Sequence, residues 1–494
     1  TQTSQDQVSP MALKPTDDLA WLDPSPISVP PDLAAAVGGH PLVAATLARR
    51  GIGTPQAARA FLYPDHYTPC PPTDLPGLAR ATERILAAIA AGEPLGIWGD
   101  FDVDGITAAT VLWETLQALG ARIGFVHIPH REREGHGIHL PTLQELLKQG
   151  VRLLITVDTG ITAHEAVTYA NSQGVDVIIT DHHTPEMGGW GDGETGREGE
   201  GGVASPYPPI TPSPHLRLPP AYAVVTNRLL PADHPLAGLP GVGCAYLLAD
   251  AVGGASHAAN LKRETWNVKH SLDLVALGIV ADVAPLTADT RYLLQRGLAA
   301  LRQSKRVGLQ ALMESAEVSA EGLTEEHIAF ALAPRLNALG RLADASLGVE
   351  LFTTADLTRA RTIAAQMEAL NAQRQLLCSQ VMAGALAQVE RHPELLDEPV
   401  LVIGQATWPA NVVGIVASRL VERFGRPAIV LSTPSGEVAR GSARSLPGID
   451  ISAAIGAHRG MLGSVGGHPM AAGLSIAPER LAEFRRALGR TVTA

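Results

Sequence analysis

The chain has 494 residues, of which 46% are hydrophobic and 18% are charged, and its formal net charge is −11 at pH 7. This length exceeds what one hydrophobic core can organise, so we expect two or more domains in an ordinary globular protein. The acidic balance argues against a protein that coats nucleic acid with its whole surface, and no apolar run reaches the roughly 20 residues that a membrane helix needs.

Residues 1–18 are polar and contain prolines, without the charged-then-apolar order of a signal peptide, so we expect a flexible leader there. The three cysteines, Cys70, Cys244 and Cys378, lie far apart and form no Cys-x-x-Cys pair. Neither a thiolate zinc site nor a disulfide framework is indicated. This cysteine usage fits a reducing cytoplasm, where we expect the protein to act.

Apolar runs of strand length alternate with segments of helical length between residues 95 and 181. Strands are predicted at 95–99, 122–128, 153–158 and 175–180, and helices at 106–119, 141–149 and 162–173. This alternation predicts an α/β domain built on a parallel sheet whose two faces are both covered. Residues 187–220 are rich in Gly and Pro and lack a hydrophobic period, so we expect a surface insertion there.

Regular structure resumes near residue 221. Residues 354–389 contain one glycine and no proline, and their apolar residues recur at helical spacing, which predicts one long connecting helix. A second alternation follows, with strands at 400–403, 428–431 and 437–444 and a helix at 412–424, and predicts a smaller α/β domain. We therefore expect a leader with a helical segment (1–60), a main domain (61–353), a connecting helix (354–392) and a second domain (393–494).

Three acids alternate directly after the first predicted strand, at Asp100, Asp102 and Asp104. In an open parallel sheet, ligand sites form at the carboxyl ends of the strands. Carboxylates this close repel and raise one another's pKa, a penalty that a bound divalent cation removes. Taken alone, the motif is explained equally well by a solvated acidic loop or a helix N-cap.

Two further strand ends carry similar groups, because Asp158-Thr159-Gly160 follows one strand and Asp181-His182-His183 follows the next. Histidine is the commonest metal ligand, and a neighbouring carboxylate fixes its tautomer. A pair of half-buried loop histidines is the alternative, but three consecutive strand ends of one sheet meet in a single crevice. Asp282 is the one acid of the apolar run 274–283 and needs a partner, which a metal, a salt bridge or an N-cap role would supply.

Several aspartates with one or two histidines favour Mn²⁺ or Mg²⁺ over structural zinc. Five or six ligands exceed what one ion with open positions needs, which predicts two ions about 3.5–4 Å apart that share a carboxylate. Such a pair activates water and stabilises charge at a phosphoryl centre, so the sequence predicts a phosphodiesterase.

Candidate phosphate-binding groups lie later in the chain. Arg335, Asn337 and Arg341 fall in a segment that reads as a Gly-terminated turn, and arginine forks match phosphate oxygens. In the second domain, small residues beside cationic ones allow the backbone to approach a ligand. These positions are Ser442, Arg444, Gly466, Gly467 and His468. Surface salt bridges and tight turns with packing glycines are the alternatives.

Together these motifs resemble the DHH phosphoesterase superfamily, whose name-giving triplet is Asp181-His182-His183 here. The resemblance runs from about residue 95 to about residue 476, with the acid loop, the Asp158 turn, the triplet and Asp282 in the family's order. Residues 440–445 and 466–473 resemble the DHH-associated domain, which binds substrate. The acid loop, the Pro-Arg-x-Asn stretch and the long helix are most similar to the bacterial exonucleases that degrade single-stranded DNA.

The resemblance implies metal-dependent 5′-to-3′ hydrolysis of single-stranded DNA to mononucleotides, in DNA repair and recombination. It implies a helicase and a single-strand-binding protein as partners, and no membrane. It also implies two Mn²⁺ or Mg²⁺ ions, with Asp158 as the bridging ligand and Asp100 as a ligand or a neighbouring acid. Reacting groups would be Asp100, Asp158 and His183, the last by holding phosphate or assisting proton transfer. The other implied ligands are Asp102, Asp104, His182 and Asp282, and the implied phosphate-binding residues include Arg335, Asn337, Arg444 and His468.

Two departures from this family pattern affect the expected function. Such exonucleases usually carry an oligonucleotide-binding barrel beyond the associated domain, and residues 474–494 leave no room for one, so we expect a short or trimmed chain with a weaker grip on long strands. The insertion at 187–220 is also atypical.

Three alternatives stay open: a relative that acts on short oligoribonucleotides or cyclic dinucleotides, a non-catalytic scaffold that binds single strands, and a type II pyrophosphatase. The full set of acids argues against the scaffold. The Gly-Gly-His stretch does not resemble the Lys/Arg clamp of a pyrophosphatase.

Overall fold

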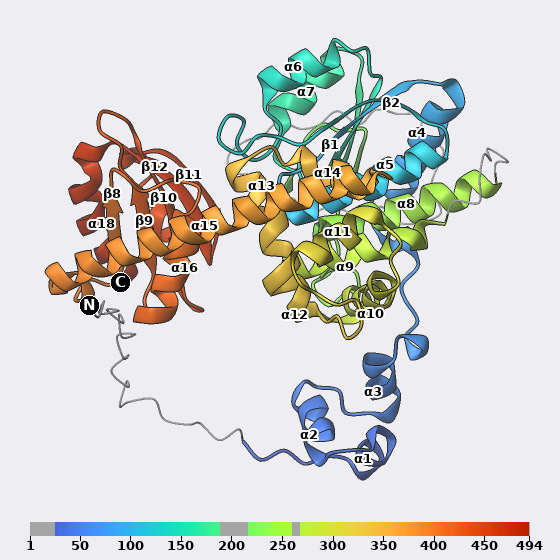
Figure 1. Ribbon diagram of the computed structural model, residues 1–494, viewed down its shortest axis with the longest axis horizontal. Helices are drawn as coiled ribbons and strands as arrows, with labels where there is room; N and C mark the ends of the chain where they lie inside the picture. Colours follow the sequence, from blue (N-terminus) through green and yellow to red (C-terminus); the bar gives the residue numbers. More distant parts are fainter. Residues whose placement is uncertain (1–24, 188–215, 259–266, 494) are drawn as a thin grey trace, which may run out of the picture. The chain divides into compact units, whose positions relative to one another are not determined.

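The computed structural model describes residues 25–187, 216–258 and 267–493 (Figure 1). The chain divides into two compact units, Thr1–Thr68 and Pro69–Ala494. The expected leader at 1–18 and most of the expected insertion at 187–220 lie outside the described residues. None of the described helices is both long enough and apolar enough to span a bilayer.

Within residues 25–68, the first unit contains three short α-helices, α1 (Pro31–Val37), α2 (Pro41–Arg49) and α3 (Pro55–Leu62). Each begins with proline, which suits the first helical position because the N–H group missing there would have no partner inside the helix. Leu33, Leu47 and Ala58 are buried together and form a small core.

The second unit is organised around a five-stranded sheet with the order β2-β1-β3-β4-β7, in which all neighbouring strands are parallel. Its strands are β1 (Pro94–Trp98), β2 (Arg122–His127), β3 (Leu153–Val157), β4 (Asp176–Thr180) and β7 (Ala223–Val225). The prediction of a parallel α/β sheet is confirmed, with strand bounds within about two residues of those expected.

Helices cover both faces of this sheet. Leu95 and Ile97 of β1 belong to a large core shared with α4 (Leu78–Ala91), α5 (Val103–Ala118), α8 (Gly241–Ala258) and α9 (Leu272–Ala281). Trp98, Leu154 and Ile179 belong to a second core shared with α6 (Leu140–Leu147) and α7 (His164–Ser172). The strands β1, β3 and β4 are consequently almost wholly buried, as expected for a parallel sheet, whereas the edge strand β2 is partly exposed.

Further helices of the larger domain enlarge the first core. They are α10 (Ala288–Arg302), α11 (Val307–Ser315), α13 (Ala333–Leu342) and α14 (Ser346–Thr353), whereas the short α12 (Glu325–His327) is exposed. The long connecting helix is also confirmed as α15 (Leu357–Arg391), which begins where the Asp356 side chain accepts hydrogen bonds from the backbone N–H groups of Thr358 and Arg359. Its first half packs on α11 and α13, and its second half belongs to the core of the smaller sheet domain.

One local expectation was wrong, because residues 333–341 form helix α13 and not a turn. A short π-helical segment, Ile328–Leu332, leads directly into α13. Pro334 is the second residue of α13 and lies in its first turn, where an α-helix tolerates proline. Gly340 is needed inside this helix because a Cβ atom there would lie 2.3 Å from the carbonyl oxygen of Phe101.

The smaller domain is a mixed sheet with the order β11-β12-β10-β9-β8. Its strands are β8 (Leu401–Gln405), β9 (Ala428–Ser432), β10 (Ala439–Arg444), β11 (Leu462–His468) and β12 (Ala471–Ile476), and only the β8–β9 pair is parallel. Helices α16 (Val413–Phe424), α17 (Ile451–Gly456) and α18 (Leu481–Thr493) complete it. The predicted second α/β domain is therefore present.

A two-stranded antiparallel ribbon marks the ends of the expected insertion. Strand β5 (Glu186–Met187) pairs with β6 (Leu216–Arg217), so the chain leaves and rejoins the described structure at neighbouring positions.

Candidate metal centre

The acid loop between β1 and α5 is buried at the carboxyl end of the sheet. Asp102 is the N-cap of α5, and its side chain accepts a hydrogen bond from the backbone N–H of Gly105 at 3.0 Å. Asp104 lies one residue inside the helix, and its two oxygens accept N–H groups of Gly241 (2.6 Å) and Val242 (2.8 Å) at the start of α8. The first turn of α8 therefore orients the Asp104 carboxylate and stabilises its charge.

The end of β3 places Asp158 with unusual backbone geometry, because its φ angle is +59°. This left-handed conformation is uncommon outside glycine, although aspartate and asparagine tolerate it better than most residues. Asp181, the first residue of the triplet, directly follows β4 and orients the residues around it. One of its oxygens accepts the Nδ1–H of His183 at 2.8 Å, and the other accepts the N–H of Ile161 at 3.0 Å.

His182 lies at the middle of the gathered acids. Its Nε2 atom is 3.2 Å from Asp158 Oδ1 and 3.8 Å from Asp104 Oδ2, and its Nδ1 atom is 3.9 Å from Asp282 Oδ2. Asp282 reaches this position as the C-cap of α9. The structure thus brings together groups from three strand ends, as the sequence predicted, and adds Asp282 from a helix end.

Burial and crowding shift the pKa values of these groups. Burial, followed by the nearby carboxylates, raises the pKa of Asp104 and of Asp158 well above the usual range. Burial and the neighbouring Asp102 raise the pKa of Asp282 to about 7. Burial lowers the pKa of His182 to about 3, whereas the hydrogen bond and charge of Asp181 outweigh burial and raise the pKa of His183 to about 9.

The donor set fits divalent cations. Asp158 Oδ1 and His182 Nε2 are buried atoms that lack a hydrogen-bond partner among the described residues. Unpartnered buried polar atoms are costly unless an ion or water satisfies them. Three groupings have ligand atoms within 4.8 Å of one another, and they overlap at Asp158 and His182: Asp158 with His182 and His183, Asp104 with His182 and Asp282, and Asp100 with Asp102 and Asp158.

Two glycines that the sequence reasoning missed make this convergence possible. A Cβ atom on Gly241 would lie 2.4 Å from Asp158 Oδ1, and one on Gly278 would lie 2.8 Å from Asp104 Oδ1. Both belong to helices that pack against α5, so the two positions must lack a side chain for the carboxylates to approach.

Four half-buried arginines gather beside the acid loop. Burial, followed by the charges of Arg131, Arg374 and Arg444, lowers the pKa of Arg341 to about 10. Arg131 stands 4.9 Å above the ring of Phe101, and the charges of Asp100 and Asp102 act on it. Such a concentration of cations favours a bound anion, and phosphate matches arginine geometry. Arg131 and Arg374 were not predicted, although Arg131 follows the predicted strand 122–128 in a segment rich in charged residues.

The loop that carries Arg131 is folded around the carboxylate of Glu134. This carboxylate accepts the backbone N–H of His130 at 2.6 Å, pairs with His127 Nε2 at 2.9 Å and accepts the Thr142 hydroxyl. These hydrogen bonds hold the pKa of Glu134 below its usual range although burial opposes them. Glu134 thereby fixes the turn from which Arg131 reaches the acid loop.

The other expected phosphate-binding residues of the larger domain have different surroundings. Arg335 pairs with Glu368 of α15 and donates to the carbonyl of Ala331, so its guanidinium is already engaged. Asn337 accepts the N–H of Val103 at 3.3 Å and thus supports the acid loop. Arg341 lies in the arginine cluster and donates to the carbonyl of Asn411 in the smaller domain at 3.1 Å.

The smaller domain presents its expected residues from two strands. Ser442 and Arg444 lie on β10, facing Gly414 of α16, where an added Cβ atom would lie 3.2 Å from the serine oxygen and 3.1 Å from the guanidinium. Gly466, Gly467 and His468 end β11, and the His468 ring stacks on that of His183 with centroids 6.3 Å apart. The roles predicted for these residues stay predictions, because their positions alone do not identify a ligand.

Comparisons with known proteins agree with this architecture. Residues 94–189 match the N-terminal domain of the DHH family, and residues 397–494 match the DHHA1 domain. The parallel sheet and the second domain are thus those of the DHH family.

Curated relatives and solved structures narrow the assignment. The chain is 37% identical over 449 residues to the single-stranded-DNA-specific exonuclease RecJ of Bacillus subtilis, covering 91% of this chain and 52% of that protein. It is 34% identical to RecJ of Escherichia coli over 436 residues, covering 85% of this chain and 70% of that protein. A crystal structure of RecJ with Mn²⁺ from Thermus thermophilus has a TM-score of 0.75 and 29% identity, covering 94% of this chain and 62% of that one.

A second solved structure, of exonuclease RecJ bound to manganese, has a TM-score of 0.67 and 31% identity, covering 85% of this chain and 95% of that one. The chain belongs to the RecJ family. It spans about half the length of the Bacillus relative.

Proposed function

We propose that the chain hydrolyses the phosphodiester bonds of single-stranded DNA from the 5′ end and releases mononucleotides, with two Mn²⁺ or Mg²⁺ ions. The observation that carries the proposal is the pair of unpartnered buried atoms, Asp158 Oδ1 and His182 Nε2, at the overlap of three possible ligand sets. The names of the relatives supply the substrate class, and the digestion polarity rests on the family resemblance alone.

In this proposal Asp104, His182 and Asp282 hold one ion, and Asp100 and Asp102 help to hold the second. Asp158 groups with Asp100 and Asp102 and also with His182 and His183, so its carboxylate would suit the role of a bridge between the two ions. Two such ions would activate water and stabilise the charge that develops on the phosphoryl oxygens. Burial and neighbouring carboxylates raise the pKa values of Asp104 and Asp158, because negative charges this close repel one another. Bound cations would relieve this repulsion.

His183 is suited to contact the substrate phosphate. Asp181 accepts its Nδ1–H group, so Nε2 is the ring atom left to face a ligand, and the pKa of about 9 keeps the ring protonated near neutral pH. A protonated imidazole donates to a phosphate oxygen and can give its proton to a leaving oxygen. The stacked ring of His468 would bring the smaller domain to the same phosphate.

The arginine cluster supports a nucleic-acid substrate in spite of the net charge of −11. Arg131 and Arg341 belong to the larger domain and Arg444 to strand β10 of the smaller domain. A phosphate bound among them would therefore contact both domains. Phosphate contacts of this kind position a strand without reading its sequence. The cytoplasmic location, the helicase and the single-strand-binding protein expected from the resemblance belong to the same proposal.

The test compares end-labelled single-stranded DNA, single-stranded RNA and a cyclic dinucleotide as substrates in Mn²⁺. We expect rapid mononucleotide release from the DNA, and from its 5′ end. Faster release from RNA or from the cyclic dinucleotide would replace the proposal with the alternative substrate. Absence of hydrolysis from every substrate, with DNA still bound, would favour a scaffold.

A further inference from the structure

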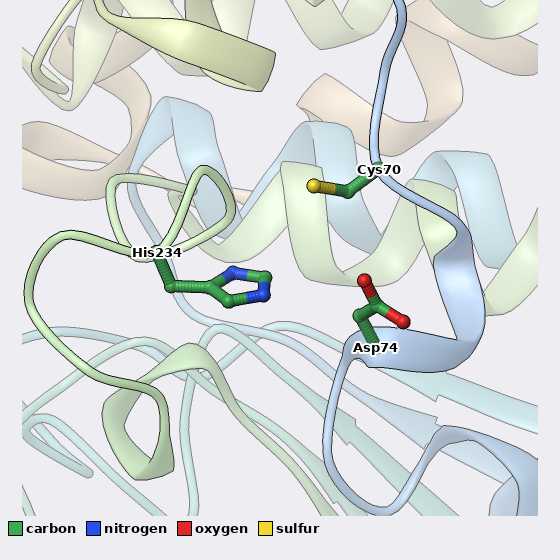
Figure 2. A group of neighbouring side chains, drawn as sticks. All are labelled: Cys70, Asp74 and His234. Atoms are coloured by element: carbon green, nitrogen blue, oxygen red, sulfur yellow. The ribbon is translucent and has the colours of Figure 1, made fainter.

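A second cluster of metal-ligating side chains lies outside the acid and histidine centre. Cys70, Asp74 and His234 each offer one ligand atom, and these atoms lie within 4.8 Å of one another. Figure 2 shows the thiol, the carboxylate and the imidazole ring turned toward a common space, and none of the three belongs to the centre already described.

The polypeptide holds these three residues in place from two distant segments. Cys70 donates its backbone N–H to Asp289 Oδ1 at 3.0 Å, and Asp74 ends a single 3₁₀ turn, Pro72–Asp74. Two backbone hydrogen bonds close the turn around His234. The His234 N–H donates to the carbonyl of Pro231, and the Ala237 N–H donates to the carbonyl of His234. Both segments are anchored in the main core, by Leu75 and Leu236, which are almost completely buried.

We propose that Cys70, Asp74 and His234 bind one Zn²⁺ ion, with water in the remaining position. A thiolate, a carboxylate and an imidazole are the three ligand types that zinc accepts, and three protein ligands with one water form a common coordination sphere. The sulfur atom selects a softer ion than the oxygen-rich centre, which suits Mn²⁺ or Mg²⁺. The absence of a Cys-x-x-Cys pair had argued against a thiolate zinc site, but that reasoning covers only ligands that are close in sequence.

Zinc binding has two local requirements. The Cys70 thiol gives up its proton, and His234 coordinates through Nε2, which moves its ring proton to Nδ1. In the structure Nδ1 accepts the N–H of Leu236 at 3.2 Å, so this long hydrogen bond is exchanged for the coordinate bond. The carboxylate of Asp74 is exposed and free to turn toward the ion.

The ion would join the start of the second unit to the segment that leads into α8. That segment, residues 231–240, is followed directly by Gly241, whose N–H donates to Asp104. Zinc bound to Cys70, Asp74 and His234 would therefore stabilise the backbone at Gly241 that orients the Asp104 carboxylate, without contacting substrate.

Cobalt substitution tests the proposal, because Co²⁺ bound to a thiolate gives a near-ultraviolet charge-transfer band and the groups of the catalytic centre include no thiol. We expect the full chain to develop this band when Co²⁺ is added in excess, so that the acid and histidine centre is filled as well. The Cys70→Ser variant should lose the band, and the matched Cys378→Ser variant should keep it. A band that survives Cys70→Ser, or no band in the unaltered chain, overturns the proposal.

Asp74→Asn provides a second variant that should fold normally, since this side chain is exposed. We expect it to weaken Co²⁺ binding by roughly tenfold or more while hydrolysis in Mn²⁺ is retained. Zn²⁺ should raise the Tm of the unaltered chain more than that of Cys70→Ser, in which the acid and histidine centre alone can bind the ion. Equal Zn²⁺-dependent Tm shifts in the two chains contradict a site at Cys70 and leave the proposed exonuclease unaffected.

Discussion

The Nε2 atom of His182 lies 3.2 Å from the Oδ1 atom of Asp158, and both atoms are buried without a hydrogen-bond partner among the described residues. In a metal-free centre this arrangement is unfavourable, because neither atom recovers the hydration that it loses on folding. A cation beside the two atoms removes the penalty. We therefore expect this pair of side chains to affect both the stability of the folded protein and its affinity for metal.

Replacement of the shared carboxylate should separate folding from activity. We expect Asp158→Asn to lower kcat by at least about 100-fold in Mn²⁺, since even residues that only support metal ligands cost 10–100-fold. Asparagine tolerates the left-handed backbone at this position better than alanine does. Activity on labelled single-stranded DNA and the Tm in EDTA are the two measurements. An active Asp158→Asn enzyme would contradict the assignment of the centre.

Metal binding should depend on pH through Asp282. Its pKa of about 7 means that the folded, metal-free carboxyl is largely protonated below neutrality. A pKa raised above the unfolded value destabilises the metal-free protein as pH rises through that range, and metal binding at low pH must displace the proton. We expect Mn²⁺ to raise the Tm more at about pH 8 than at about pH 6. The Asp282→Asn variant should show a smaller difference between the two pH values.

The arginines of the cluster should differ from Arg335 in their effect on substrate. We expect Arg341→Ala and Arg444→Ala to raise KM for 5′-phosphorylated single-stranded DNA by about tenfold or more, the loss of one charged hydrogen bond. Arg335→Ala is the matched control, because Arg335 pairs with Glu368. It should lower the Tm slightly and leave KM nearly unchanged. A similar rise in KM for all three variants would show that the cluster has no special role.

Glycine 241 should be as necessary as a metal ligand although it has no side chain. In Gly241→Ala the new Cβ atom would meet the Asp158 carboxylate at 2.4 Å, so the carboxylate or α8 must shift. We expect a loss of Mn²⁺-dependent activity of about 100-fold, since small displacements of reacting groups have effects of this size. Gly253→Ala, in the same helix, meets nothing within 4 Å and should retain full activity. Equal activities would show that the centre tolerates the displacement.

Glu134 should act through Arg131. Removal of its carboxylate in Glu134→Ala leaves the His130 N–H and His127 without their partner, so the turn that presents Arg131 loosens. We expect KM to rise in the same direction as in Arg131→Ala, and the double variant to add little, because residues in one network are not additive. Glu145→Ala, which removes an exposed pair with Lys148, is the control. Fully additive changes in KM would separate Glu134 from Arg131.

The parallel sheet and the gathering of acids at its edge could be predicted because both are marked by short patterns in the sequence. Apolar runs bounded by Asp100, Asp158 and Asp181 mark strand ends, and parallel strands bring those ends to one edge. The helix at 333–342 was misread because Pro334 and Gly340 resemble turn residues, whereas the preceding π-helical turn continues into α13. Gly340 is required by its approach to the carbonyl of Phe101, a contact with a distant segment that no local pattern contains.

Contacts between distant segments could not be predicted for the same reason. Gly241 and Gly278 are ordinary helical glycines until the carboxylates that they face are known. Cys70 and His234 are separated by more than one hundred residues, and only the folded chain places them beside Asp74. The arginine cluster likewise assembles from the larger domain, α13, α15 and β10.

The pairing of Glu186–Met187 with Leu216–Arg217 has a practical consequence for labelling this protein. Because the two ends of the intervening segment are clamped together just after the histidine triplet, a change in its length adds only a slowly growing loop-closure entropy. A fluorophore-binding tag or an affinity epitope could thus replace residues 188–215 without displacing β4. Such a graft would leave Asp181, His182 and His183 in their native register at the end of β4.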